Sequence, residues 1–437
     1  MKKSIKNRAV LRSLSLVIAL LALSAAAYAA WRWSLIHRRN NRLLALQTLH
    51  CPTRVEEWEL IGHPPNGADA LLVQALFMLE MPPDLLADLP VVSNSRLPEP
   101  DLELDAEILE KIHFLLDANT DFFTFLELYP VAEPPIPPVE SVLWHEQATP
   151  LIHHCLRAQQ ILLLRIYIEI QEGAVGRDAA RRVQEMLLLT ELLSAFPNPH
   201  GQHQAARSVL YACRAMDLLI NHSGIPWTAA ELDGLKQSFQ RLDLHHGAAR
   251  SVAGAVIRGR LRIEGPTGPA LTYFMPHLAE TELSPAASLW LYGSAQLDRK
   301  AVQLFDLARS TWQSLHNEPQ PTPPGRLAEV LPPNTTLAAM GGPFLDEFAS
   351  LSQLSDHIQI AEAWRAIALQ TIAQVVGEAT TGLDPFSGEP IRVVTTPAGA
   401  TAIYSVGPNG TDEGGQTIPL ESDRPDLVFL LMPAPEG

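Results

Sequence analysis

The residues best suited to chemistry lie near the C-terminus, in a loop rich in acidic residues and glycine. Asn409, Asp412 and Glu413 are followed by Asp423 and Asp426, so several oxygen ligands stand within a short stretch. Ca²⁺ takes about six to eight such ligands at about 2.3–2.6 Å, and flexible backbone lets carbonyls complete the shell. The spacing differs from that of an EF-hand loop. The loop therefore has two interpretations, a calcium site or a solvated turn.

The chain also has 15 histidines, which invite a metal or acid–base interpretation. The closest sets are His153–His154, His245–His246, and His200 with His203. Zinc needs about three or four ligands, and no carboxylate or cysteine stands at a supporting spacing. Helix capping, surface exposure or an interior hydrogen bond is the more usual role, and we favour it here.

Catalytic signatures are missing from the sequence. His145–Glu146 opens like a zinc protease motif, but Thr149 stands where the second histidine ligand belongs. A nucleophile elbow, a phosphate-binding Walker loop and a dinucleotide-binding glycine triplet are also absent. Acids between Glu80 and Glu127 could supply a carboxylate pair for glycoside cleavage, yet such acids are common on helix surfaces. We favour a non-enzymatic role, with an envelope hydrolase that uses a cleft of the helical body as the alternative.

One basic cluster interrupts an otherwise acidic body. It consists of Arg250, Arg258, Arg260 and Arg262. Arg258 and Arg262 are four residues apart and share a helix face, so they could bind an anion or pair with acids of the same fold. We favour internal pairing.

An apolar N-terminal segment is expected to decide where in the cell the body that carries these residues lies. Nineteen residues, Ser13 to Trp31, carry no charge, and as a helix they would span about 28 Å of a hydrocarbon layer about 30 Å thick. Five Lys or Arg residues precede the segment and four follow it closely, which is only a weak orientation signal. Because large domains translocate regardless of their charge, we expect a cytoplasmic N-terminus and a body in the periplasm, anchored in the inner membrane.

A cleaved secretory signal is the alternative for this segment. Leu16 to Leu23 resembles the apolar core of a signal peptide, and Ala27-Tyr28-Ala29 fits a cleavage site. Apolar residues from Leu35 to Leu49 nevertheless continue the helical pattern, as expected for a stalk that leaves the membrane.

Charge and cysteine content limit the partners. The net charge is −16, and because the first 42 residues hold nine cations and no acid, the remainder carries −25. An acidic body is a poor nucleic-acid binder, so we exclude DNA and RNA. Cys51, Cys155 and Cys213 form no CxxC pair and no disulfide framework, although one pair could form in the periplasm.

The sequence predicts a mainly α fold in three parts. These are a tip, transmembrane helix and stalk over 1–50, an all-α body of several helices over 51–379, and a small antiparallel sheet within 380–437. Helical periodicity is clearest from Arg182 to Phe196, and Thr228 with Glu231 forms a capping-box pattern that opens a helix. After Gly382 the apolar period changes to two, which predicts two or three short strands packed on the preceding helix.

The last part of the chain resembles a known family. Asp384-Pro385-Phe386-Ser387-Gly388, with the stretch from Tyr404 to Gly410, is similar to the C-terminal segment of the major pseudopilins of type II secretion. In that family an Asp-Pro turn precedes a short sheet whose loop binds calcium. The resemblance covers about an eighth of the chain and implies Asn409, Asp412 and Asp423 as calcium ligands, with no other cofactor expected.

The N-terminus departs from that family. Pseudopilins have a glycine before the cleavage point and a glutamate within the apolar segment, and neither residue occurs between Met1 and Trp31. The complete arrangement resembles a class of bacterial membrane-anchored helical envelope proteins to which no activity is assigned. We therefore expect a single-span periplasmic scaffold or interaction protein, associated with secretion through its cap and with protein partners in the envelope.

Overall fold

The computed structural model confirms the mainly α fold with a small C-terminal antiparallel sheet. It describes most of the chain, and structural statements below refer to these residues: 2–54, 67–80, 82, 89, 104–129, 145–175, 179–224, 227–264, 295–316, 345–378, 382–415 and 426–432.

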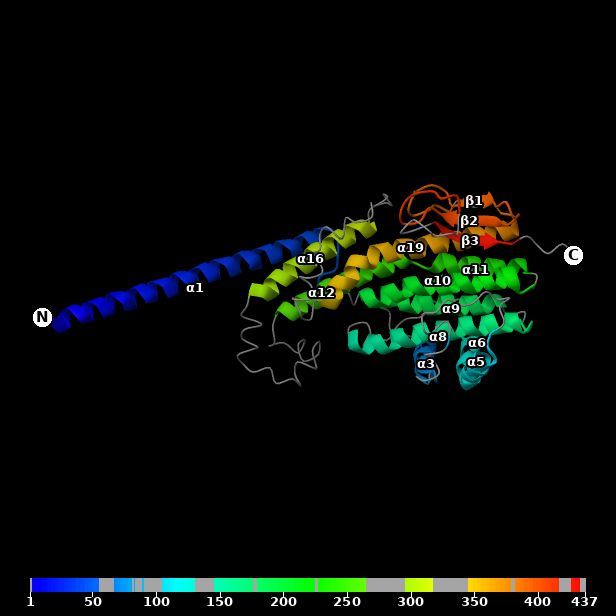
Figure 1. The fold of residues 1–437 in the computed structure, drawn as a ribbon, viewed down its shortest axis with the longest axis horizontal. Helices are drawn as coiled ribbons and strands as arrows, with labels where there is room; N and C mark the ends of the chain where they lie inside the picture. The colour runs from blue at the N-terminus through cyan, green and yellow to red at the C-terminus, as the bar shows by residue number, and fades with distance from the viewer. Residues whose placement is uncertain are drawn as a thin grey trace. The chain divides into compact units, whose positions relative to one another are not determined.

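The helices and strands follow in chain order (Figure 1). They are α1 (Lys2–Thr48), α3 (Gly67–Phe77), α5 (Ala106–Ala118), α6 (Thr120–Leu128), α8 (His145–Gln171), α9 (Ala179–Ala195), α10 (Pro199–His222), α11 (Ala229–Arg241), α12 (Leu244–Glu264), α16 (Ala295–His316), α19 (Leu345–Val376), β1 (Arg392–Thr395), β2 (Thr401–Ser405) and β3 (Leu427–Leu431).

The chain divides into two compact units. The first comprises Met1–Trp58 and Val256–Ser310, and the second comprises Glu59–Ala255 and Thr311–Gly437. The division falls within α12 and α16, so each of these helices contributes to both units. The expected boundaries at residues 50 and 379 stay a prediction.

In the first unit, α1 is one continuous helix that begins before the uncharged segment and ends at Thr48. His50 then adopts a left-handed backbone with φ of 58°, and the Cys51 N–H donates to the Leu46 carbonyl at 3.1 Å. This is a left-handed C-cap, which satisfies a carbonyl that the end of the helix leaves free. The described part of the chain contains one helix that is long and apolar enough to cross a membrane, over Val17–Thr48.

In the second unit, α10 is the central helix and packs against α8, α9 and α19. Small buried residues such as Ala205, Ala212 and Ala215 let its neighbours approach closely. The buried Gln159 of α8 donates to the Met186 carbonyl of α9 at 3.1 Å and also to side-chain hydroxyls. A polar link within the apolar core therefore fixes how these helices face each other.

Helix starts in this unit follow the local sequence. The Thr228 hydroxyl accepts from the Glu231 N–H at 3.2 Å, and the Glu231 carboxylate accepts from the Thr228 N–H at 2.7 Å. The predicted capping box is thus present at α11. At α10, Asn198 caps the Gly201 N–H at 2.6 Å and Pro199 occupies the first turn, where its missing N–H costs nothing.

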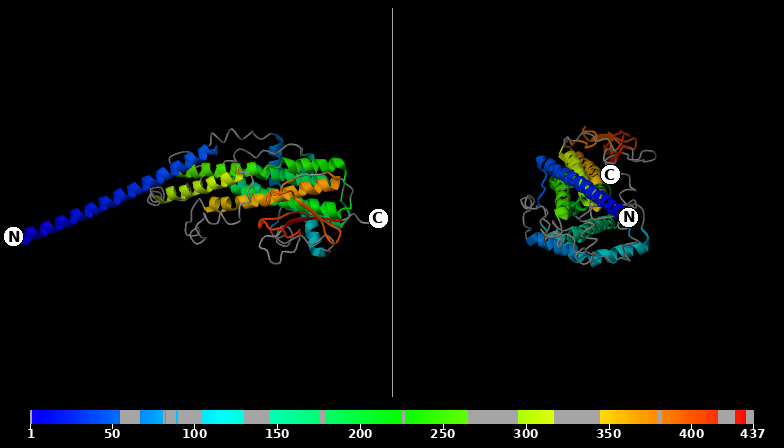
Figure 2. Two further views of the ribbon diagram at one scale, coloured as in Figure 1. Left: turned by 90° about the horizontal axis from the view of Figure 1, so that it is seen from above. Right: turned by 90° about the vertical axis from the view of Figure 1, so that its left-hand side faces the viewer.

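The sheet has the order β1-β2-β3, with both pairs antiparallel. It packs on α19, and β3 also contacts α10, as the sheet beside α19 shows in Figure 1. The right-hand view of Figure 2 shows α3, α5 and α6, in blue and cyan, on the side of the second unit that faces away from the sheet. The Asn221 side chain of α10 bonds the Leu430 carbonyl at 2.7 Å and the Met432 N–H at 2.9 Å, which secures β3.

The period-two pattern does not produce one buried face per strand. β1 is largely exposed, with Val393 at 37% exposure, whereas β2 is buried on both faces from Ala402 to Ser405. α19 contacts β2, and the acidic loop covers Tyr404, because a Cβ at Gly415 would lie 2.8 Å from the Tyr404 ring. The sequence pattern could not show that a loop doubles as a covering layer.

Candidate functional site

The C-terminal cap, residues 382–432 as described, is built around the buried carboxylate of Asp384. This side chain accepts from the Phe386 N–H at 2.9 Å, the Ser387 hydroxyl at 3.1 Å, the Ser405 hydroxyl at 2.8 Å and the Val406 N–H at 3.0 Å. Only 2% of Asp384 is exposed. A carboxylate that already accepts four hydrogen bonds is a structural anchor, which ties the Asp-Pro turn to the end of β2.

Asp412, one of the three implied calcium ligands, is held within the cap. Its carboxylate pairs with Arg392, accepts from the Gly414 N–H at 2.9 Å and accepts from the Tyr404 hydroxyl at 3.1 Å. The Gly414 hydrogen bond, followed by those from Tyr404 and Arg392, lowers the pKa of Asp412. A guanidinium already neutralises this carboxylate, so a cation here would have to compete with Arg392.

Asn409, the second implied ligand, also has partners inside the loop. Its side-chain oxygen accepts from the Thr411 N–H at 2.9 Å, and its amide nitrogen donates to Glu413 Oε1 at 2.7 Å. Asp423, the third, lies outside the described residues. The structure therefore brings Asn409 and Asp412 into one loop, and the calcium assignment itself stays a prediction.

Glu413 and Asp426 form the part of the loop with free ligand capacity. Asp426 is 6% exposed, and its Oδ2 accepts from the Gly415 N–H at 2.9 Å. Within the described residues, Asp426 Oδ1 and Glu413 Oε2 are both buried without a hydrogen-bond partner. Burial first, and then contact with Glu413, raises the pKa of Asp426 to about 6. Two such carboxylates must share a proton, bind a cation or repel each other.

The sequence indicated the acidic character of this loop but not which oxygens would be free. Asp426 directly precedes the apolar run Leu427–Leu431, a position that places it at the buried start of a strand. That neighbourhood was the available signal. Across the described chain, no group of three or more His, Cys, Asp or Glu side chains is placed to hold a metal ion.

A second set of ionisable side chains, one of them with a shifted pKa, joins α6 to α9, and no sequence pattern predicted it. Glu185 is 2% exposed and pairs with Arg181 at 3.3 Å, and burial raises its pKa to about 7. Arg181 also donates to the Glu127 carbonyl at 2.6 Å and to the Tyr129 carbonyl at 2.9 Å. These carbonyls lie at the C-terminal end of α6, so Arg181 caps that helix. The same side chain thereby links α9 to α6.

The histidines meet in pairs drawn from different helices. His203 of α10 and His357 of α19 place their Nδ1 atoms 2.5 Å apart, and burial lowers the pKa of His357. The His153 and His200 rings meet edge to face at 5.5 Å. His200 and His203 therefore have separate histidine neighbours, although the sequence suggested that they might act together.

The arginine cluster is used inside the fold. Arg250 donates to the Ser194 carbonyl at 3.4 Å, and Arg260 donates to the Thr53 carbonyl at 3.3 Å. Arg258 is 2% exposed, and the side chain of Arg262 lies outside the described set. Both of these hydrogen bonds go to backbone carbonyls, and Asp243 also acts electrostatically on Arg250, so the expected pairing with acids stays a prediction.

Comparisons with protein-family models, with curated proteins and with solved structures found no match. The resemblance of the cap to pseudopilins thus stays a prediction.

Proposed function

We propose that this chain is a single-span membrane protein whose helical body is a scaffold or interaction module in the periplasm, closed by the C-terminal cap. The observation that carries the membrane part is the bare apolar surface of α1. Between Val17 and Leu23, the large apolar side chains are 51–71% exposed: Val17, Ile18, Leu20, Leu21 and Leu23. Each would gain about 1.5–3 kcal/mol on leaving water, and a lipid bilayer supplies that environment.

An exposed apolar surface on the second unit supports the interaction role. It lies on α3, α5 and α6, which pack together and against α8. Its members are exposed by 51–80% and comprise Leu71, Phe77, Met78, Phe114 and Leu128. Large apolar side chains left exposed on neighbouring helices are candidates for a surface that another molecule covers.

The membrane proposal is tested by washing membranes with alkaline carbonate and by fusing a reporter after residue 60. We expect the intact chain to stay in the pellet and alkaline phosphatase, which is active only outside the cytoplasm, to be active in the fusion. A mature chain that starts at Ala30, or a reporter active only in the cytoplasm, would contradict the anchor or the topology respectively.

The interaction role is tested by in vivo crosslinking. Substituting Phe114→Ser and Leu128→Ser should remove crosslinked species that the wild-type chain forms. The matched control exchanges Val375→Ser on α19, another exposed apolar residue. If crosslinks depend equally on Val375, the α3–α5–α6 surface is not the interaction site.

Calcium binding by the cap is a second candidate function, and the Glu413–Asp426 pair favours it. Two buried carboxylate oxygens without a donor fit the hard oxygen ligands that Ca²⁺ takes, and carbonyls of the Gly414–Gly415 turn could complete the shell. We expect calorimetry of the full-length protein to show calcium binding at millimolar or lower concentration, and Glu413→Gln with Asp426→Asn to abolish it.

The matched control for calcium is Asp233→Asn on the exposed face of α11, which should leave binding unchanged. Since the pKa of Asp426 is about 6, protons should compete with the ion and weaken binding below that pH. Absence of binding at millimolar calcium would exclude the site.

A further inference from the structure

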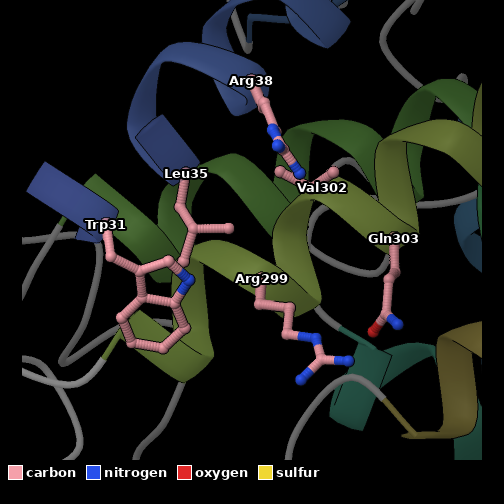
Figure 3. A pocket seen from close by; sticks show the side chains of 6 residues that line it. All are labelled: Trp31, Leu35, Arg38, Arg299, Val302 and Gln303. Atoms are coloured by element: carbon pink, nitrogen blue, oxygen red, sulfur yellow. The ribbon is translucent and has the colours of Figure 1, made fainter. Parts of the chain in front are cut away.

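A groove in the first unit lies directly beyond the uncharged segment of α1. α1 and α16 enclose a cavity of about 370 Å³ (Figure 3). The lining residues are Trp31, Leu35 and Arg38 of α1 and Arg299, Val302 and Gln303 of α16. We call this the α1–α16 groove. Trp31 and Leu35 lie together on the α1 side, and Arg38 extends toward Val302 (Figure 3).

Ion pairs hold the two walls of the groove together. Asp298 of α16 is 5% exposed and pairs with Arg39 at 2.8 Å and Arg32 at 3.8 Å. One level further along both helices, Asp306 pairs with Arg42 at 2.6 Å. α1 and α16 thus run in the same direction, and both carboxylates are engaged by arginines that do not line the groove.

The arginines that line the groove have no such partner. Among the described residues, neither Arg38 nor Arg299 forms a salt bridge or a side-chain hydrogen bond, and both are exposed. They stand beside an apolar wall that includes Leu35, at 7% exposure. A guanidinium binds a phosphate through two parallel hydrogen bonds, so the groove offers uncompensated phosphate donors next to apolar surface.

The groove lies at the height of lipid headgroups when α1 spans the membrane. Trp31 ends the uncharged segment, and Arg38 stands seven residues further, or about 10 Å along the helix axis. The headgroup layer extends about 5–8 Å beyond the hydrocarbon core. Helical side chains lean toward the N-terminus, so the Arg38 side chain leans back toward the bilayer. The indole of Trp31 suits the same interfacial layer.

We propose that the α1–α16 groove binds the headgroup phosphate of an anionic phospholipid, with Arg38 as the phosphate ligand and Arg299, whose side chain points away from Arg38 in Figure 3, as a second cation for the anionic headgroup. Trp31, Leu35 and Val302 would contact the glycerol and the first methylenes, and the Gln303 amide would donate to a headgroup oxygen. The inference rests on the proposed membrane span. A soluble anion would use the arginines but would gain nothing from the apolar wall, which is why we commit to a lipid.

Native mass spectrometry of the full-length protein in detergent tests the groove, with phosphatidylglycerol and phosphatidylcholine as the two probes. We expect wild type to retain phosphatidylglycerol about tenfold more tightly than phosphatidylcholine. Arg38→Gln with Arg299→Gln should remove that preference. Arg38→Lys with Arg299→Lys should keep most of it, because an anionic lipid surface attracts lysine as well as arginine.

The matched control is Arg157→Gln with Arg207→Gln on α8 and α10. It removes the same charge elsewhere and should leave the preference for phosphatidylglycerol unchanged. Equal retention of both lipids by a carbonate-resistant wild type would overturn the lipid site while leaving the anchor intact. Displacement of the lipid by inorganic phosphate at equal concentration would also overturn it, since a free anion would then suffice. A wild-type chain that carbonate extracts would instead refute the span itself.

Discussion

At the level of single residues, the buried carboxylates fall into two groups according to their partners. Asp384 accepts four hydrogen bonds, whereas Asp426 and Glu413 each keep a buried oxygen without a donor. A carboxylate whose oxygens all accept hydrogen bonds stabilises the fold. A buried carboxylate oxygen without a donor is a place where a ligand or a proton can add stability. The two groups therefore predict opposite responses to substitution.

Replacing Asp384 should loosen the cap. Asp384→Ala leaves two backbone N–H groups and two hydroxyls without their acceptor, which we expect to destabilise the cap by about 3 kcal/mol. Limited proteolysis and hydrogen exchange of residues 382–415 would report the change. Asp233→Ala on exposed α11 is the matched control, and equal protection of the cap in both variants would contradict the anchoring role.

Glu185 should make the stability of the helical body depend on pH. Its folded pKa of about 7 lies above the ordinary 4.5, so the folded state holds the proton more tightly and stability falls as pH rises from about 4.5 to about 7. Glu185→Gln keeps an acceptor for Arg181. It should remove the loss of about 1–3 kcal/mol in unfolding free energy that the wild type shows over this pH range.

The measurement is the unfolding midpoint of wild type and variant at pH 5 and pH 8. The exposed Glu107→Gln serves as control, because its carboxylate is 74% exposed. The same pH dependence in Glu185→Gln as in wild type would show that this carboxyl is not responsible.

At the residue scale, the sequence could predict contacts only between residues that lie close together in the chain. The Thr228–Glu231 capping box is complete within four residues, so the local pattern suffices to identify it. Arg181 reaches carbonyls more than fifty residues away, and the Glu413–Asp426 pair forms only after the loop folds over β2. Side-chain contacts of this kind depend on packing that periodicity does not contain.

At the level of elements, the helical periodicity was a good guide except where two helices meet without a break. The helical pattern from Arg182 to Phe196 and the capping box at Thr228 correspond to α9 and α11, but no pattern predicted α6. A single residue, Asn119, separates α5 from α6, and its side chain bonds both the N–H and the carbonyl of Glu80. Neither proline nor glycine stands at the boundary between α5 and α6, so no helix-breaking residue predicts it.

Helix α11 provides a test of how much a predicted cap contributes. Thr228→Ala removes the hydroxyl that caps the Glu231 N–H and should cost about 1 kcal/mol. Hydrogen exchange of the first turn of α11 would detect it, and Thr228→Ser, which keeps the hydroxyl, should behave as wild type. Unchanged protection in Thr228→Ala would mean that tertiary packing alone holds this helix end.

At the level of the whole molecule, the three cysteines bear on the environment of the body. Cys51, Cys155 and Cys213 are all buried and form no disulfide, and burial raises the pKa of Cys155 and Cys213. The disulfide that the sequence left open is therefore absent from this fold. A buried thiol with a raised pKa is protected from oxidation even in an oxidising compartment.

Thiol labelling tests this protection directly. We expect no cysteine of the native full-length protein to react with a membrane-permeant maleimide and all three to react after denaturation. Phe77→Cys, at an exposed site, is the positive control. Rapid labelling of the native wild type would contradict the protection of these buried thiols.

The uninterrupted course of α1 has a further consequence for the α1–α16 groove. Trp31, Leu35 and Arg38 share one side of a helix that continues without a break from the uncharged segment to Thr48. Each added residue turns everything beyond it by about 100°, so one alanine inserted at position 34 would swing Arg38 away from the azimuth of Trp31. Seven inserted residues would restore the phase to within about 20° but would move Arg38 about 10 Å farther from the uncharged segment.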